Sequence, residues 1–173
     1  MGKMFHVVSY DNFCKYFKNK SIIDTNTIQR EFNNEKKRAF ETVMERIRSL
    51  KYPELPSRIS SLFVFPDKNK DEAEEEWARV FSNGQYILLT LEMIDGSIKW
   101  FDYSIYTLQE INNDIAEQYW SSCSDSPKNI VSNSIEGQFQ GTAKIVEIDS
   151  KMYSRESGIT FMEKIPLPCT DSE

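Results

Sequence analysis

The stretch YILLTLEMIDGSIKWFDY, residues 86–103, decides the fold class. Two runs rich in β-branched and aromatic residues, 86–93 and 97–103, flank the dipeptide Asp95-Gly96. An Asp-Gly pair between such runs is a strong hairpin signal, because a tight two-residue turn needs residues that tolerate positive φ. We therefore expect an antiparallel strand pair in the middle of the chain.

The flanking sequence adds helices and strands without a regular β-α-β alternation. Residues 5–9 read as a strand, and Asp11 or Asn12 is placed to cap a short helix that carries Phe13. Residues 27–50 have apolar side chains at intervals of mostly three and four, which indicates a long helix, broken near Asn33-Asn34. The further expected elements are a strand at 60–65, a helix at 70–81, a helix at 107–120, a polar loop at 121–134, strands at 135–141 and 142–148, and a weak strand at 159–161. In the helix at 107–120, the side chains expected to face inward are Leu108, Ile111, Ile115, Ala116 and Tyr119.

This order favours an α+β fold with a mixed, mainly antiparallel sheet and helices packed on it. The chain has 173 residues, a length at which roughly 70% of the unfolded surface is buried on folding. Neither a repeat nor a linker divides it, so we expect one domain over residues 1–173, with a weakly structured tail from about residue 154.

Charge and cysteine content limit the environment and the partners. The net charge is −6, which argues against general nucleic-acid binding, although basic residues between 15 and 51 could form a local patch. The acidic run at 71–76 is expected to be the solvated first turns of a helix. Three widely spaced cysteines form no disulfide framework, and no apolar run approaches the ~20 residues that cross a bilayer. We expect free thiols, no membrane partner and a cytoplasmic location.

Common catalytic and cofactor motifs are absent from the sequence, and one histidine, His6, rules out a histidine-rich metal site. We therefore expect no metal cofactor. The residues that remain as candidates are His6 in the first strand, Arg58 and Ser60 at the entrance to the second, and Glu136 at the start of a late strand. Each of them alone has an ordinary structural interpretation.

Taken together and in this order, the blocks resemble a known family. The opening FHVVSYDNF of residues 5–13, the segment PSRISSLFVF of residues 56–65 and EGQFQG of residues 136–141 are similar to successive blocks of DarT-like ADP-ribosyltransferases and their bacterial relatives. Asp102 and residues 116–120 fall between them in the expected order. The resemblance covers most of residues 4–148, and it implies an ADP-ribosyltransferase-like fold with a split, mainly antiparallel sheet.

The resemblance implies an enzyme that takes NAD as a substrate and transfers single ADP-ribose groups. Glu136 would be the catalytic carboxylate that stabilises charge at the ribose, and His6 would act beside it by binding the same ribose. Arg58 would pair with the pyrophosphate, and Ser60 would orient His6 or the ribose. Tyr103 would stack on the nicotinamide, although a core position in the hairpin is its simpler interpretation.

The acceptor of the ADP-ribose would be a protein or a nucleic acid. Family members of this kind serve as toxins, phage-defence factors or counter-defence factors, in some cases held by an inhibitory partner protein.

Two further functions stay open beside the enzyme. Gln140 stands where the family commonly has an acidic residue, which favours the alternative of a catalytically inactive binding module on the same fold. An unrelated α+β interaction protein is the third possibility.

Overall fold

The computed structural model describes residues 2–28, 34–81, 84–107 and 111–168. They form two compact units. The first unit comprises Met1–Asp24, Val64–Asp95 and Gly141–Glu173, and the second comprises Thr25–Phe63 and Gly96–Gln140. Three strands run through both units: β3 (Leu62–Pro66), β4 (Gln85–Asp102) and β5 (Ile135–Ser154).

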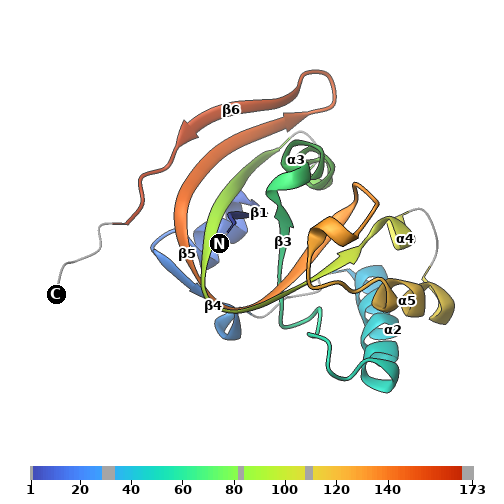
Figure 1. The fold of residues 1–173 in the computed structure, drawn as a ribbon. Coiled ribbons are helices and arrows are strands. Elements are labelled where there is room, and N and C mark those ends of the chain that lie inside the picture. The colour runs from blue at the N-terminus through green and yellow to red at the C-terminus, as the bar shows by residue number, and fades with distance from the viewer. Residues whose placement is uncertain (1, 29–33, 82–83, 108–110, 169–173) are drawn as a thin grey trace. The chain divides into compact units, whose positions relative to one another are not determined.

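The first unit is built on antiparallel strands. Strand β1 (Met4–Ser9) pairs with β4 along its whole length, from Met4 opposite Leu91 to Ser9 opposite Tyr86, and it also pairs with β3. A short β2 (Ile22–Asp24) pairs with β5, and β6 (Gly158–Lys164) forms a long antiparallel ribbon with β5 (Figure 1). The sequence predicts only a weak strand at 159–161, whereas β6 is a strand of seven residues, and its pairing with β5 shifts register between Ser150 and Lys151.

Helices flank these strands. Helix α1 (Tyr10–Tyr16) begins at Ser9, whose Oγ accepts the backbone N–H of Asn12 at 3.2 Å. The expected caps Asp11 and Asn12 were therefore wrong, since both lie in the first turn. The chain then forms two 3₁₀ turns, η2 (Asp67–Asn69) and η3 (Arg79–Phe81), on either side of helix α3 (Lys70–Ala78), which packs on β1 and β6. Apolar side chains from β1, β3, α3 and β4 form a core with Tyr153.

The acidic run does not behave throughout as a solvated helix turn. Glu74 is buried, and its carboxylate accepts the Tyr86 hydroxyl at 2.7 Å and the Lys151 ammonium at 2.8 Å. Its neighbours Glu75 and Glu76 are exposed, as the sequence predicts. Glu74 is one turn from the buried Ala78, so it lies on the inward stripe of α3 and binds a tyrosine and a lysine there.

The second unit carries the remaining helices. Helix α2 (Glu35–Lys51) begins after Asn34, close to the expected break, and Asn34 caps it by accepting the Lys36 N–H at 2.8 Å. Thr27, where the long helix was expected to begin, belongs to a 3₁₀ turn, η1 (Thr25–Thr27), and residues 29–33 of the expected helix lie outside the described part of the chain. Helix α5 (Asn113–Ser121) packs against α2 and against the four-residue α4 (Ser104–Thr107) (Figure 1). A 3₁₀ turn, η4 (Pro127–Asn129), lies within the expected polar loop.

Only parts of the expected helix at 107–120 are seen. Its N-terminal residues are divided between α4 and an extended segment before α5, and residues 108–110 lie outside the described part of the chain. Ile115, Ala116 and Tyr119 are buried as predicted, and the indole N–H of Trp120 donates to the carbonyl of Met44 at 2.9 Å. This bond fixes α5 against α2.

The central hairpin is wrong. Strand β4 continues through Asp95 and Gly96, and Gly96 has a φ of 103°. Glycine is needed there for its positive φ, as the sequence indicates, but the two halves of β4 pair with other strands instead of with each other. The expected strands at 135–141 and 142–148 are likewise one strand, β5, in which Gly141 has a φ of 140°.

These pairings establish an α+β protein in which β1 pairs antiparallel with β3 and β4, and β5 with β2 and β6. Among the described helices, none is long and apolar enough to cross a membrane.

Candidate functional site

The second unit contains a buried arginine that lies between two carboxylates. Arg58 precedes β3 and is 4% exposed. Its Nε and Nη2 donate to the two carboxylate oxygens of Glu41 at 3.0 and 3.3 Å, and its Nη1 donates to Oε1 of Glu136 at 2.5 Å. The carboxylates come from different elements, Glu41 from α2 and Glu136 from β5, and each is at most 6% exposed. Arg58 therefore joins a helix to a strand through charged hydrogen bonds away from water.

Aromatic rings surround the guanidinium. The rings of Phe63, Tyr119, Tyr106 and Phe40 lie 4.6, 5.1, 5.3 and 5.5 Å from Cζ of Arg58, distances at which a cation is attracted to a ring face. Burial acts to lower the pKa of Arg58, but Tyr106, Tyr119, Glu136 and Glu41 raise it well above its ordinary value. Arg58 is therefore a permanent cation in this site.

Two tyrosine hydroxyls complete the shell of Glu136. Tyr119 donates to Oε1 at 2.5 Å and Tyr106 donates to Oε2 at 2.8 Å. Burial, together with the negative charge of Glu136, raises the pKa of both tyrosines well above the ordinary value, so both remain protonated donors. The carboxylate of Glu136 consequently accepts three hydrogen bonds and is held in one orientation.

The Nε2 amide of Gln138 donates to the Tyr119 hydroxyl at 2.8 Å. Gln138 is two residues beyond Glu136 on β5, so the two side chains share one face of the strand. Gly137 faces the other way, where a Cβ would lie 2.7 Å from the Trp100 ring. We call the six residues Glu41, Arg58, Tyr106, Tyr119, Glu136 and Gln138 the Arg58 cluster.

The structure brings together two of the residues that the sequence predicts for the site, Arg58 and Glu136. Ser60 is exposed, and its Oγ accepts the Nε2 amide of Gln140 at 3.0 Å. Tyr103 is buried, its backbone N–H donates to the carbonyl of Ser134 at 2.9 Å, and its ring lies 6.3 Å from that of Tyr106. It packs beside the cluster as a core residue.

His6 belongs to the first unit, where it is half-buried on β1 opposite Leu89. Its ring contacts that of Phe17 edge to face at 5.8 Å. The predicted approach of His6 to the ribose, and hence to Glu136, stays a prediction.

Sequence reasoning missed Glu41, Tyr106, Tyr119 and Gln138 as members of a polar cluster. Glu41 was detectable, because it lies three residues before the buried Met44 on α2, and an acid on the inward stripe of a helix indicates a buried cation. Tyr119 was predicted to face inward, but a pattern of apolar positions does not reveal that its hydroxyl binds a carboxylate. Tyr106 and Gln138 left no signal of this kind.

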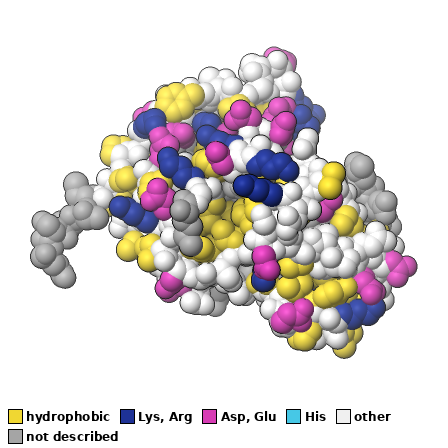
Figure 2. Space-filling model, viewed as in Figure 1, with side chains coloured by type: hydrophobic (Ala, Val, Ile, Leu, Met, Phe, Trp, Pro, Cys, Tyr) yellow, Lys and Arg dark blue, Asp and Glu magenta, His cyan; other side chains and the backbone are white. Residues whose placement is uncertain are grey.

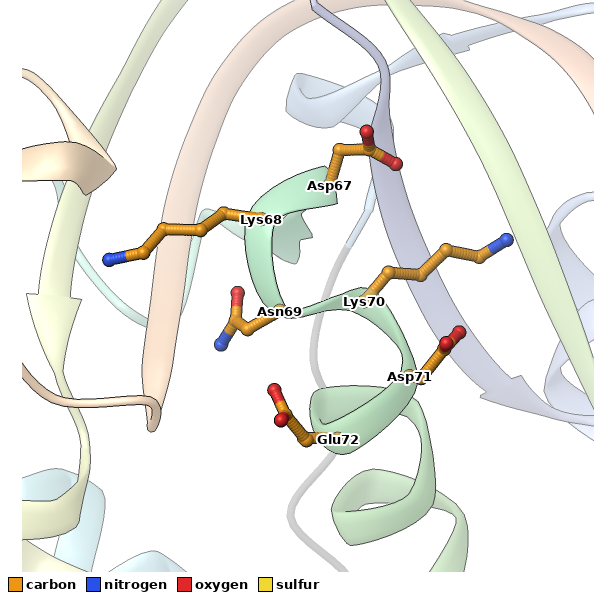
Figure 3. Close-up of a pocket in the computed structure, with 6 residues that line it drawn as sticks. All are labelled: Asp67, Lys68, Asn69, Lys70, Asp71 and Glu72. Carbon is orange, nitrogen blue, oxygen red and sulfur yellow. The ribbon is translucent and has the colours of Figure 1, made fainter.

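A second polar feature lies in the first unit, where residues 67–72 line a depression of about 290 Å³ around η2 and the start of α3. Figure 3 shows Lys68 and Lys70 extending to opposite sides, with the carboxylates of Asp67 and Asp71 on the side of Lys70. Charges of both signs are mixed here, so the depression favours neither an anion nor a cation. Within the described residues, no group of three or more His, Cys, Asp or Glu side chains could hold a metal ion.

The fold and the cluster define a class: an α+β protein whose second unit holds a buried Glu-Arg-Glu arrangement closed by two tyrosines. The chain belongs to the family described as protein of unknown function DUF2441, whose profile matches residues 2–151. The matched range includes all of the Arg58 cluster. No curated protein matches the chain.

Proposed function

We propose that this protein is an NAD-dependent mono-ADP-ribosyltransferase that modifies a macromolecular acceptor, a protein or a nucleic acid. The observation that carries the proposal is the hydrogen bond from Nη1 of Arg58 to Oε1 of Glu136, at 2.5 Å. The two residues lie in separate sequence blocks that resemble the DarT-like family, and they are 78 positions apart in the chain. The split-sheet fold of these transferases is part of the same proposal.

The proposed reaction needs a carboxylate with a fixed position. The bond between the nicotinamide nitrogen and the anomeric carbon breaks, its electron pair neutralises the pyridinium ring, and the ribose develops positive charge. A nucleophilic oxygen or nitrogen of the acceptor then bonds to the anomeric carbon and loses its proton. A carboxylate beside this carbon stabilises the developing charge, as in glycoside hydrolysis. Three hydrogen bonds hold Glu136 in one orientation for this role.

The geometry adds a role for Arg58. Its described hydrogen bonds go to Glu41, Tyr119 and Glu136, so in this proposal Arg58 positions the catalytic carboxylate. Binding of the pyrophosphate by Arg58 stays a prediction, as do the roles of His6, Ser60 and Tyr103 toward NAD.

The biological setting follows from the resemblance and is proposed on that basis. We propose a cytoplasmic toxin, phage-defence or counter-defence factor, held in check by an inhibitory partner protein. On the face seen in Figure 2, Lys and Arg side chains are interspersed with Asp and Glu. A surface of mixed charge suits a protein acceptor, or a nucleic acid bound at a local patch, better than uniform coating of a nucleic-acid backbone.

The alternative is a binding module that retains the fold without turnover. One observation favours it: Glu136 is 4% exposed, and both of its carboxylate oxygens already accept hydrogen bonds. In this function the Arg58 cluster holds the second unit together, and an interaction surface elsewhere performs the biological task.

Nicotinamide release from NAD by the purified protein tests the proposal, with two matched variants. Glu136→Gln and Glu41→Gln each remove one buried carboxylate from Arg58 and leave the other in place, so their effects on folding are comparable. Of these two carboxylates, only Glu136 contacts the substrate in the proposed mechanism. We expect Glu136→Gln to lower kcat at least 100-fold and Glu41→Gln to keep activity within tenfold, at a temperature where both are folded.

Equal losses in the two variants would show that the cluster is structural, which favours the binding module. Absence of release from the unmodified protein, with and without cell lysate as a source of acceptor, together with no heat of NAD binding, would exclude the transferase.

A further inference from the structure

Gln138 carries a polar atom that the Arg58 cluster leaves unsatisfied. The residue is fully buried in the centre of the second unit's part of β5. Its Nε2 donates to Tyr119, whereas its carbonyl oxygen Oε1 has no hydrogen-bond partner among the described residues. Buried carbonyl oxygens are almost always paired in native proteins, so this one calls for an explanation.

The orientation of the Gln138 amide follows from the chemistry of its neighbours. The Tyr119 hydroxyl has one proton, and the carboxylate of Glu136, 2.5 Å away, can only accept it. Arg58 donates to the same hydroxyl at 2.8 Å, which leaves Tyr119 one further lone pair and no proton for Gln138. Gln138 must therefore present its N–H to Tyr119, and Oε1 must face the opposite direction. Exchanging the amide oxygen and nitrogen would break this bond.

Gln138 Oε1 is thus a fixed acceptor next to Glu136. The two residues are two positions apart on one strand face, roughly 7 Å along the strand. The Gln138 oxygen is neutral and accepts from no donor in the described part of the chain, whereas the carboxylate of Glu136 has donors on both oxygens. A ligand bound at Glu136 would need only a small ring to span the distance to the unsatisfied carbonyl of Gln138.

We propose that Gln138 Oε1 accepts an N–H of the primary carboxamide on the pyridinium ring of NAD. This inference rests on the proposed function, and it assigns the part of the substrate that Gln138 recognises. NAD has two kinds of hydrogen-bond donor close to the bond that breaks. The ribose hydroxyls would donate to Glu136, which leaves the carboxamide N–H of the pyridinium ring as the donor for Gln138. A neutral carbonyl held by Tyr119 is suited to an amide N–H and repels a carboxylate at the same place.

The residues around the cluster differ in their exposure to solvent. Phe40 and Tyr106 are half-buried and meet edge to face at 5.1 Å, whereas Arg58, Tyr119 and Glu136 are buried. Tyr106 also occupies Oε2 of Glu136. In this proposal the Tyr106 hydroxyl leaves the carboxylate when NAD binds, and a ribose hydroxyl takes its place.

The test compares NAD with its nicotinic-acid analogue, in which a carboxylate replaces the carboxamide. Wild-type protein should prefer NAD by at least tenfold in kcat/KM for release of the base. The variant Gln138→Met keeps the side-chain volume and removes the carbonyl, so it should raise KM for NAD about tenfold and reduce the preference. Gln85→Met, in the first unit, where the amide donates to Oγ of Ser150 at 2.8 Å, is the control and should keep the preference.

A structural measurement separates binding from folding. Gln138→Met removes the unsatisfied oxygen together with the donor to Tyr119, so its melting temperature in the absence of NAD should stay within a few degrees of wild type. An unchanged preference in this variant, or wild-type protein that accepts both dinucleotides equally, would overturn the role of Gln138 while the transferase stands. Wild-type protein that neither binds nor cleaves NAD would overturn both. Because the wild-type preference is measured without any substitution, the inference stays testable if Gln138→Met does not fold.

Discussion

Arg58 and Glu41 form a bidentate ion pair inside the second unit, with Nε and Nη2 of the arginine 3.0 and 3.3 Å from the two carboxylate oxygens. The same guanidinium also contacts Glu136, so one cation neutralises two buried carboxylates. Removal of the cation leaves both charges in a poorly solvated environment, where the cost is far greater than at the surface.

Arg58→Met should therefore lower the free energy of unfolding by about 3–5 kcal/mol, as is typical when one partner of a buried ion pair is removed. Urea denaturation measures this change. Lys51→Met is the control, because the Lys51–Glu117 pair is about half exposed and screened by water, so its loss should leave the free energy of unfolding nearly unchanged. Comparable losses in the two variants would show that Arg58 is not the stabilising centre of its unit.

Three tyrosines make the stability of the protein sensitive to alkaline pH: Tyr86 and Tyr119, which are buried, and Tyr106, which is half-buried. Burial raises the pKa of Tyr86, Tyr106 and Tyr119, in each case together with a neighbouring glutamate. In the unfolded chain these groups ionise near pH ~10, whereas in the folded chain they ionise at higher pH. The unfolded state therefore loses protons first, and folding stability is full below pH ~10 and falls as the pH rises above it.

Spectrophotometric titration of tyrosinate tests this expectation. The chain has eight tyrosines, and we expect Tyr86, Tyr106 and Tyr119 to ionise only together with unfolding, as a late step in the titration. Tyr119→Phe should make that step smaller. A titration in which all tyrosines ionise together near pH ~10 while the chain is still folded would contradict the burial of these hydroxyls.

The sequence predicts most of the helices and strands but few of the contacts between them. Asp95-Gly96 correctly marks a positive φ, but a local dipeptide cannot report that β4 pairs with β1 through Met4 to Ser9. Pairing of this kind depends on residues about 80 positions away. The strands expected at 5–9 and 60–65 and the later part of the long helix agree with the structure, because β-branched runs and apolar spacing act locally.

The candidate site shows the same division. Arg58 and Glu136 were selected from separate blocks, and their contact joins residues 78 positions apart. Glu41 and Tyr119 were interpreted only as positions in predicted helices. Periodicity indicates which side of a helix faces inward, but not what the polar atoms on that side bind. Sequence reasoning thus found the two ends of the central ion pair, and the tertiary fold supplied the groups that hold it.

The acidic run of α3 contains one structural acid among solvated ones. Glu74 accepts the Tyr86 hydroxyl and the Lys151 ammonium and is 3% exposed, whereas Glu75 is exposed and pairs with Arg79 one turn away. Glu74→Ala should lower the free energy of unfolding by about 3–5 kcal/mol, because Lys151 loses a buried counter-charge. Glu75→Ala should change it by ~0.5 kcal/mol or less.

Thermal or urea unfolding of the two single variants distinguishes these neighbours, which have the same chemistry and differ only in the side of the helix. If both substitutions had small effects, Glu74 would be a surface residue and α3 would be rotated relative to β1 and β4.

Gly137 provides a test of the packing that supports the Arg58 cluster from the opposite face of β5. A Cβ on this residue would lie 2.7 Å from the Trp100 ring and 2.9 Å from Cγ2 of Ile98, closer than carbon atoms can approach. Gly137→Ala must therefore displace the indole or the strand that carries Glu136 and Gln138, and overpacking of this kind costs about 1–3 kcal/mol. We expect that loss in urea denaturation, and a recovery of part of it in the double variant Gly137→Ala with Trp100→Leu, because the smaller side chain makes room for the methyl group.

Gly2→Ala, where no atom lies within 4 Å of the new Cβ, should have no effect. If the double variant were no more stable than the sum of its single changes predicts, the ring of Trp100 would not lie against Gly137, and β4 and β5 would not be neighbours in the second unit.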